Sequence, residues 1–313
     1  MKINVKRAEA IRLHAHWILY FHEVMQAGTI RGAAKTLNVA PSAISRKMKE
    51  IEATVGGKLM ERRSDGFRLT AAGEVVADHV SQVLRGLGRM QNSLDELRGL
   101  RRGHVTIAAV PASAPDFVPR IVAAFRKSYP RITFHVDFVG TRHVTERVRE
   151  GEADIGVCFS PSKTRAIRQI ISVPLPFGAV VSPDNRFAQC KTVRLYDLVD
   201  ANQPLIFPDE SISVRQLLER VIIDSALEVQ PAIVSSNRDF TIGLAQFGAG
   251  VAFQTTLGIE RELREGTLSF VPLVDPHLKP SHLAIITSGL RPQAPAVSLM
   301  AEALRTGAAE LLK

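Results

Sequence analysis

Hydroxyl and basic side chains recur at helical spacing in a short stretch near the N-terminus of this 313-residue chain. Residues 30–49 have the sequence IRGAAKTLNVAPSAISRKMK, and helical periodicity in its second half exposes Ser42, Ser45, Arg46, Lys47 and Lys49. Short hydroxyl side chains near a helix N-terminus can bond to phosphates or base edges, and an arginine can reach O6 and N7 of guanine. The pattern therefore predicts a helix that enters the major groove of DNA.

A second basic group follows in Glu61–Thr70, ERRSDGFRLT, which predicts a β-hairpin with its turn at Asp65-Gly66. Such a hairpin beside the helix would lie as a wing against the phosphate backbone. Upstream, Thr29 can cap the first helix. The candidate DNA-contacting residues are Thr29, Arg31, Pro41, Ser42, Ser45, Arg46, Lys47, Lys49, Arg62, Arg63 and Arg68.

These side chains need two helices that cross over a tight turn. Ala34, with Ala33 beside it, supplies the small residue at the crossing, and Asn38 is a residue type that tolerates the left-handed region. Pro41 suits the first turn of the second helix, where its missing N–H costs nothing. Apolar contacts are expected from Leu37, Val39, Ile44 and Met48. An ordinary pair of helices with a basic face would share these features. The predicted β-hairpin wing and the charge distribution favour DNA binding over this alternative.

The charge of the chain is concentrated in its first third. Residues 1–102 hold 18 Lys/Arg and 10 Asp/Glu, a net charge of +8, whereas residues 103–313 hold 22 and 21, a net charge of +1. A basic block joined to a near-neutral body indicates a module that binds a polyanion. A solvated basic surface would give the same count.

A long amphipathic helix follows the basic block. Its apolar residues are spaced 4, 3, 4, 3, 4 and 3 apart, which predicts a coiled-coil seam over about three heptads. Gly86 and Gly88 weaken this helix by about 1 kcal/mol each relative to alanine. A helix that packs on its own chain is the alternative to dimerisation. The candidate dimerisation residues are Val76, Val80, Val83, Leu87, Met90, Leu94 and Leu97.

The rest of the chain alternates apolar strands with amphipathic helices, which is typical of an α/β fold. We expect strands at His104–Val110, Thr133–Val139 and Asp154–Phe159, and helices at Phe117–Tyr129 and Val144–Glu150. Loops after parallel strands are where α/β proteins bind small molecules. The candidate effector contacts in such loops are Ala112, Ser113, Thr141, Phe159, Ser160, Phe207 and Asn237.

Enzyme chemistry has little support in the sequence. It contains no HExxH, GxSxG or CxxC motif and no glycine-rich phosphate loop after a strand. We therefore expect no catalytic residues, no metal site and no cofactor. The two cysteines, Cys158 and Cys190, do not suggest a disulfide framework, and Cys158 is expected in the core. No apolar run reaches membrane-span length and no secretory signal opens the chain, so we expect a cytoplasmic protein.

The motifs resemble a known family. The run FHEVMQAGTIRGAAKTLNVAPSAISRKMKEIEATVGGKLMERRSDGFRLTAAGE resembles the N-terminal domain of LysR-type transcriptional regulators, and RRGHVTIAAVPASAPDFVPRIVAAFRKSYPRITF, REGEADIGV and FGAGVAF resemble their effector-binding domain. The similarity extends from about residue 15 to about residue 310. This chain has Ala40-Pro41-Ser42 where many members have Ser-Gln-Pro, so operator preference is not carried over.

The resemblance implies a multidomain α+β architecture. An N-terminal extension (1–14) would precede a winged helix-turn-helix domain (15–72, with the helix-turn-helix at 30–49) and a dimerisation helix (73–101). A periplasmic-binding-protein-like α/β domain (102–313) would follow, with lobe I at 102–174 and 280–313 and lobe II at 175–279. The effector would bind between the lobes.

The expected function is sequence-specific transcriptional regulation controlled by a small effector. The expected partners are double-stranded DNA with a pseudo-palindromic operator, further copies in a homodimer or homotetramer, and a small organic acid or amino acid. RNA polymerase is a further candidate partner, and no membrane partner is expected. Two alternatives stay open: a nucleoid-type DNA-binding protein with a non-sensing body, and a solute-binding protein or enzyme with an added helical domain.

Overall fold

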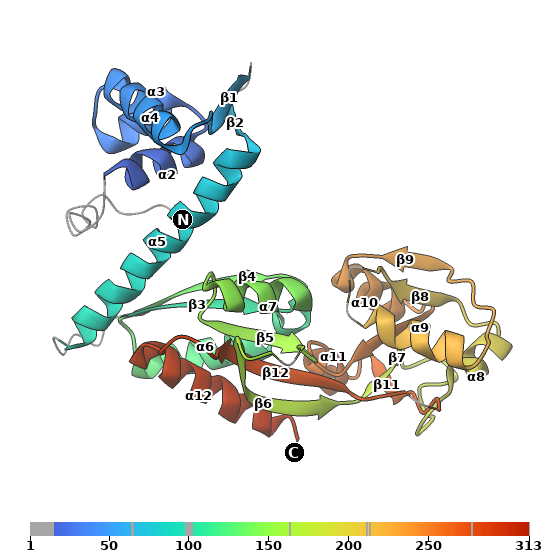
Figure 1. Ribbon diagram of the computed structural model, residues 1–313. Helices are drawn as coiled ribbons and strands as arrows, with labels where there is room; N and C mark the ends of the chain where they lie inside the picture. The colour runs from blue at the N-terminus through green and yellow to red at the C-terminus, as the bar shows by residue number, and fades with distance from the viewer. Residues whose placement is uncertain are drawn as a thin grey trace. The chain divides into compact units, whose positions relative to one another are not determined.

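The computed structural model describes residues 16–63, 66–97, 103–162, 164–210, 212, 214–276 and 278–312. The chain forms two compact units, Met1–Gln91 and Asn92–Lys313 (Figure 1). The predicted N-terminal extension and Asp65 of the predicted wing turn lie outside the described residues. No helix among the described residues is long and apolar enough to cross a membrane.

The first unit is a winged helix-turn-helix, as the sequence predicted. Three helices open it: α2 (Trp17–Ala27), α3 (Ile30–Leu37) and α4 (Pro41–Val55). The antiparallel hairpin of β1 (Met60–Arg63) and β2 (Gly66–Leu69) follows, and then the long helix α5 (Ala71–Leu97). The second helix of the predicted 30–49 motif thus continues six residues further, to Val55.

Local chemistry sets the ends of α3 and α4. Thr29 Oγ1 accepts a hydrogen bond from the Gly32 amide at 3.0 Å, which confirms the predicted cap. Asn38 has a φ of 53°, in the left-handed region, and Pro41 occupies the first turn of α4. Ala33 and Ala34 are buried where the helices cross. The residues that predicted the motif therefore set the ends of the two helices and the contact between them.

The wing and the start of α5 are anchored by hydrogen bonds to backbone groups and by one close backbone approach. The Phe67 amide donates to the Gly28 carbonyl at 3.1 Å, which ties β2 to the turn before α3. Thr70 Oγ1 donates to the Lys58 carbonyl at 2.7 Å and accepts from the Gly73 amide at 3.0 Å. A Cβ at Gly73 would collide with the Leu59 carbonyl. Because of this close approach, the start of α5 is fixed to the segment that precedes the wing.

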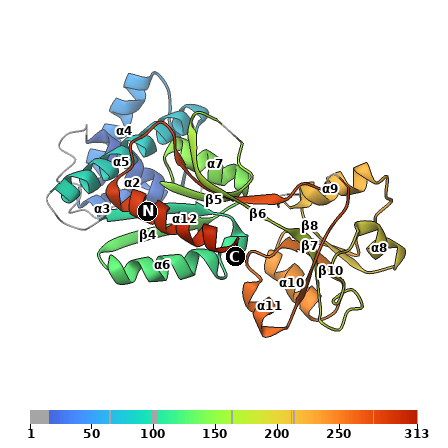
Figure 2. The ribbon, with the colours of Figure 1, turned by 90° about the horizontal axis from the view of Figure 1, so that it is seen from below.

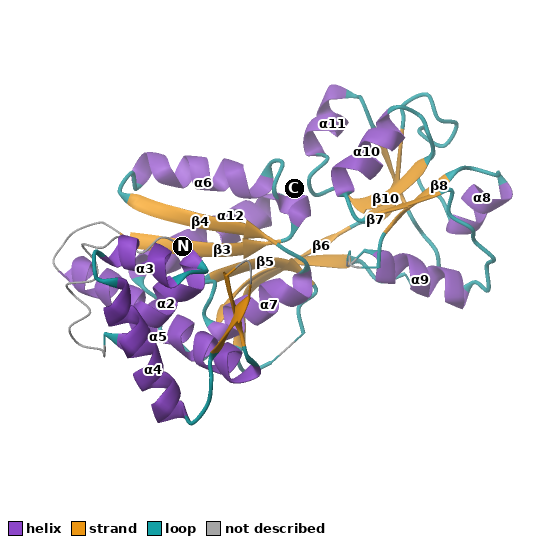
Figure 3. Ribbon diagram, turned by 90° about the horizontal axis from the view of Figure 1, so that it is seen from above, coloured by secondary structure: helices purple, strands orange, loops and turns teal. Residues whose placement is uncertain are grey.

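Lobe I of the second unit is built on a five-stranded mixed sheet in the order β4-β3-β5-β12-β6. Strands β3, β4 and β5 run parallel, whereas β12 is antiparallel to β5 and β6. Helices α6 and α12 cover one face and α7 the other (Figures 2 and 3). The elements are β3 (Gly103–Ala109), α6 (Phe117–Ser128), β4 (Ile132–Phe138), α7 (Thr141–Glu150), β5 (Ile155–Phe159), β6 (Ile167–Leu175), β12 (Ser281–Ser288) and α12 (Pro295–Glu310), with a short 3-10 turn at Pro111–Ser113.

Lobe II has a second five-stranded sheet in the order β11-β7-β10-β8-β9. Strands β8, β9 and β10 are parallel, and β7 is antiparallel to β10 and β11. Helices α8 and α9 lie on one face and α10 and α11 on the other (Figure 3). The elements are β7 (Phe177–Val181), α8 (Leu195–Asp200), β8 (Leu205–Pro208), α9 (Arg215–Asp224), β9 (Ile233–Ser235), α10 (Arg238–Gln246), β10 (Val251–Thr255), α11 (Glu260–Glu265) and β11 (Ser269–Pro272).

The predicted strands and helices of lobe I agree with the structure to within one residue, apart from α7. That helix begins at Thr141, three residues before the predicted Val144. Cys158 is fully buried in β5, as expected, and burial raises the pKa of its thiol to about 12. Its side chain is therefore a neutral core residue near neutral pH.

Candidate DNA interface and effector site

One face of α4 is free of the domain core. Ile44, Met48 and Ile51 are buried on the opposite face, which packs the helix into the unit. Ser42, Arg46 and Lys49 are exposed and Ser45 is half-buried, and their spacing places all four on one side of the helix. We call these four residues the reading face. It combines short hydroxyl donors with two cations, which is the chemistry that base edges and phosphates accept.

Lys47 lies off the reading face. Its ammonium pairs with Glu50 Oε2 at 2.7 Å, and this bond lowers the pKa of the Glu50 carboxyl. Helical spacing places both residues on the flank of α4, between the reading face and the buried face. Within the described part of the unit, Lys47 is thus a predicted cation of α4 that already has an ion-pair partner.

The other predicted DNA contacts surround α4. Thr29, Arg31, Pro41 and Arg68 are exposed, and Arg68 stands opposite Glu61 in the wing. The structure places Arg62 and Arg63 on β1, but their side chains lie outside the described part of the unit.

Four of the seven residues of the predicted seam on α5 pack against the core of their own unit. Val80 and Leu87 are buried in the core together with Leu84, a residue off the seam. Val76 and Val83 are half-buried, and Met90 is 36% exposed. The side chains of Leu94 and Leu97 lie outside the described residues. Packing on the same chain, the alternative left open by the sequence, therefore accounts for part of this pattern.

A groove of about 540 Å³ runs beside the N-terminal half of α5. Most of its lining is apolar, and one lining residue, Val75, is 72% exposed. The walls come from the start of α2, the second half of α4 and the first turns of α5. The lining residues are Trp17, Lys47, Glu50, Ile51, Thr54, Val55, Val75, Val76 and His79.

A buried histidine lies in the core of the same unit. His22 on α2 is 6% exposed, and within the described residues neither ring nitrogen has a hydrogen-bond partner. Burial lowers the pKa of His22, so its neutral form is favoured in the folded unit.

The predicted effector contacts of lobe I gather at the carboxyl ends of β3, β4 and β5. Thr141 Oγ1 accepts from the Phe159 amide at 3.3 Å, which joins two of these loops. Ser160 has a φ of 40° and is bonded through its amide and hydroxyl to His282. Ala112 and Ser113 lie in the turn after β3, where Ser113 Oγ donates to the Val110 carbonyl at 2.7 Å. The structure therefore places these loops at one edge of the sheet. Two of the predicted residues are buried there, because Phe159 packs in the lobe I core at 6% exposure and Ser113 is fully buried.

The two predicted effector contacts of lobe II, Asn237 and Phe207, lie in different environments. Asn237 precedes α10, and its side-chain oxygen accepts from the Phe240 amide at 3.0 Å, so it caps that helix. Phe207 is 1% exposed and packs edge-on against Phe253, with the Arg215 guanidinium over its ring. The Phe207 side chain is a core residue of lobe II, and we no longer include it among the candidate effector contacts.

The two lobes touch at the carboxyl ends of their parallel strands. A Cβ at Gly258, in the turn after β10, would collide with the Ala112 carbonyl after β3. Arg238 at the start of α10 donates to the Gly258 carbonyl at 2.5 Å. Sequence reasoning missed both residues, because an arginine after a helix cap and a glycine after a strand look like surface and turn residues. Only the fold brings them to the junction.

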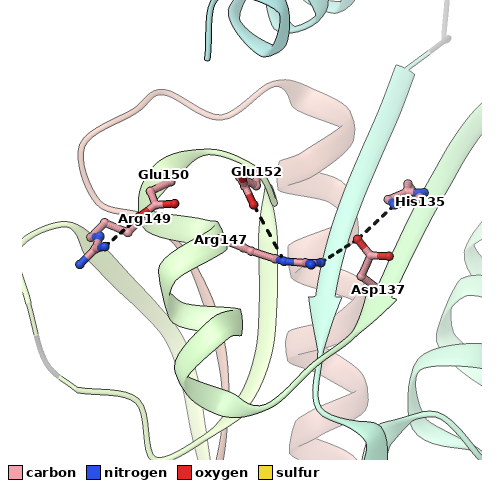
Figure 4. Close-up of polar contacts among 6 residues, drawn as sticks. All are labelled: His135, Asp137, Arg147, Arg149, Glu150 and Glu152. Carbon is pink, nitrogen blue, oxygen red and sulfur yellow. Dashed lines mark hydrogen bonds and ion pairs between the residues drawn. The ribbon is translucent and has the colours of Figure 1, made fainter. Parts of the chain in front are cut away.

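Polar residues also cluster on the surface of lobe I, at β4 and α7 (Figure 4). Asp137 Oδ2 is 2.8 Å from Arg147 Nη1 and 3.1 Å from His135 Nε2. The side chains of this group are between 33% and 58% exposed, so the pairs are screened by solvent. We assign this group to the solvated surface of the lobe.

Comparison with known proteins agrees with this architecture. Residues 15–74 match the family model for bacterial regulatory helix-turn-helix proteins of the lysR family, and residues 98–309 match the model for the LysR substrate binding domain. The chain belongs to the LysR family of transcriptional regulators. It is thus a DNA-binding transcriptional regulator with an effector-binding domain, and not an enzyme.

Relatives of this LysR-family regulator match over most of their length. The HTH-type transcriptional regulator YwbI of Bacillus subtilis is 28% identical over 269 residues, which cover 86% of this chain and 88% of that protein. The transcriptional activator CmpR of Synechocystis is 23% identical and covers 81% of this chain and 83% of its own. The full-length CbnR structure in complex with its target DNA has a TM-score of 0.69 at 22% identity, with 93% of this chain and 99% of that chain covered. At this identity the likeness to CbnR concerns the fold.

Proposed function

We propose that this regulator reads a pseudo-palindromic operator with the reading face of α4. The observation that supports this most directly is the division of α4 into a buried apolar face and an exposed face of hydroxyls and cations. Arg46 is the long, planar donor of the set and is suited to guanine, whereas Ser42 near the helix N-terminus is suited to a phosphate or base edge. Arg31 and Arg68 would bond to flanking phosphates. Lys47, paired with Glu50, would contribute little.

We infer that two copies bind together through α5. Val76 lines the groove beside α5, and the half-buried Val83 and the exposed Met90 follow it at seven-residue spacing on the same side of the helix. Apolar side chains in this position gain from burial against a second copy, by about 25 cal/mol per Å² of apolar surface. A dimer places two reading faces on two half-sites, about one helical turn of DNA or a multiple of it apart. A tetramer would join two such dimers.

We further propose that a small organic acid or amino acid binds between the lobes. Thr141, Ser160 and Asn237 carry hydroxyl and amide groups in the loops at the strand ends of the two lobes. Effector binding would change the separation of the lobes and through it the DNA complex.

Binding to the upstream intergenic DNA tests the reading face. We expect Arg46→Ala to lower the affinity roughly 10- to 100-fold, because a good base contact contributes about 1–3 kcal/mol. Fluorescence anisotropy at several salt concentrations gives the affinity and the number of phosphate contacts.

Arg264→Ala is the matched control, because it removes the same charge from an exposed position in the second unit. It should leave the affinity within about twofold. Equal losses for Arg46→Ala and Arg264→Ala would contradict the reading face. An affinity that is the same for operator and random DNA would favour the nucleoid-type alternative.

A further inference from the structure

The turn after β10 sends neighbouring side chains into two different cores. Leu257 is 1% exposed and packs in the lobe I core, whose other described members lie in residues 105–175 and 283–308. Ile259, two residues later, is fully buried in a lobe II core with Ile242 and Leu268. A single turn is therefore fixed to both lobes by burial of apolar side chains.

Gly258 lies between these two side chains, next to the Ala112 carbonyl of lobe I. It has a φ of +85°, which L side chains rarely adopt. A Cβ here would collide with the Ala112 carbonyl and lie 2.9 Å from Arg238 Nη2. The Gly258 amide donates to Glu260 Oε2 at 2.6 Å. A side chain at this position would force the turn or the Ala112 segment of lobe I to move.

Arg238 holds the turn from the lobe II side. Its side chain is 12% exposed, with Nη2 on the Gly258 carbonyl at 2.5 Å and Nη1 on Asp239 Oδ1 at 2.7 Å. With the amide oxygen of Gln254 turned toward it, that oxygen accepts from Nε at 2.7 Å and from Nη2 at 3.0 Å. A planar guanidinium with several fixed partners orients each of them, which a flexible ammonium cannot do.

We propose that Ala112, Leu257, Gly258 and Arg238 form an inter-lobe clasp that sets the separation of the two lobes. The chain itself crosses between the lobes twice, from β6 to β7 and from β11 to β12. The clasp is a third, noncovalent connection, and Arg238 is its positioning residue. A role of the clasp in regulation rests on the proposed function. Ala112 is a candidate effector contact, and so is Asn237, the residue before Arg238. An effector bound beside the clasp would tighten it or open it.

The lobe separation can be measured in the full chain with two dyes. Cys190 is exposed in lobe II and supplies one site, whereas Cys158 is buried with its thiol pKa raised to about 12 and should stay unlabelled. Lys127→Cys on α6 supplies an exposed site in lobe I. Energy transfer between the two dyes then reports the distance between lobes without DNA or effector.

Gly258→Ala is the first test, and Gly266→Ala is its matched control. Gly266 has a φ of +69°, but a Cβ there meets no atom within 4 Å, so the control has similar backbone strain and no clash between the lobes. We expect a longer mean dye distance for Gly258→Ala and no change for Gly266→Ala. Equal distances in both variants and the wild type would overturn the clasp.

Arg238→Lys is the second variant, and it keeps the proposal testable if Gly258→Ala does not fold. Lysine retains the charge but cannot reproduce the fork that bonds to Gly258 and Asp239. We expect a broader or longer distance distribution than for Arg261→Lys, whose arginine is 74% exposed. An unchanged distribution in folded Arg238→Lys would also overturn the proposal. Neither result depends on the operator or the effector, so a failed clasp is distinct from a failed regulator.

Discussion

The two units build their sites in opposite ways. The reading face comes from residues 42–49 of a single helix, and helical periodicity alone brings its side chains together. The clasp and the effector contacts come from loops between Ala112 and Gly258, which only the two sheets bring to one place. A site within one element depends on that element's packing, whereas a site between lobes depends on every connection that fixes their separation. Substitutions should therefore act locally in the first unit and across the lobes in the second.

The largest expected effect is a loss of stability in the first unit. It would show that this unit also depends on a contact between residues distant along the chain, that of Gly73 with Leu59. Gly73→Ala places a methyl group against the Leu59 carbonyl, so α5 must shift away from the segment before the wing. We expect the first unit to lose about 1–3 kcal/mol of unfolding free energy, as overpacked sites do. Chemical denaturation followed by circular dichroism measures this change.

Gly88→Ala provides the control on the same helix. A Cβ at Gly88 meets no atom within 4 Å. It should raise the unfolding free energy by about 0.5–1 kcal/mol, because alanine favours helix. If both alanines stabilise the unit, the close approach at Gly73 does not constrain α5.

A smaller effect distinguishes position on α4 from charge alone. Lys49→Ala removes a cation from the reading face, whereas Lys47→Ala removes one that pairs with Glu50 on the flank. We expect Lys49→Ala to reduce the slope of log affinity against log salt by about 0.9, the value for one phosphate contact. Lys47→Ala should leave the slope nearly unchanged. Equal slopes for the two variants would mean that charge count, and not the reading face, governs binding.

The smallest expected effect is a difference between the two units in how their stability depends on pH. The pKa of His22 is lowered by burial, so the unfolded chain binds its proton more readily and the first unit loses stability as pH falls below about 6.5. Burial raises the pKa values of Asp275 and Glu260 in the second unit, so those groups contribute stability that is lost as pH rises through their folded pKa. Thermal unfolding between pH 5 and pH 7.5 should show the first unit weakening on mild acidification.

His22→Leu should remove that acid sensitivity from the first unit. His143→Leu, at an exposed histidine of α7, serves as the control. A pH dependence that persists in His22→Leu would assign the effect to another group.

Sequence reasoning succeeded where the physics is local. Thr29, Asn38 and Pro41 set helix ends through their own backbone preferences and side-chain bonds, and each appears as predicted. The alternation of strands and helices in lobe I was recovered for the same reason. The α/β character of the body followed from these patterns, whereas the family and the two-lobed architecture followed from the resemblance of whole motifs.

Long-range contacts account for what the sequence did not reveal. The spacing of Val80 and Leu87 fitted a partner helix, yet both side chains pack on their own unit. Phe207 follows the pattern of a loop contact but fills the lobe II core. Arg238 carries no local signal, because its importance comes from Gly258, twenty residues further along, and from the Ala112 turn of the other lobe. The identities of these residues are visible in the sequence, but their neighbours are not.

The uninterrupted run of α5 from the wing to Leu97 has a consequence for how such regulators diverge. Each residue of an α-helix advances the chain by about 1.5 Å and turns it by about 100°. One inserted residue would thus swing everything beyond it by more than a quarter turn, whereas four inserted residues would nearly restore the phase. We therefore expect insertions and deletions in α5 to be tolerated best in steps of about one helical turn. Such steps nearly preserve the orientation of the residues that follow the helix.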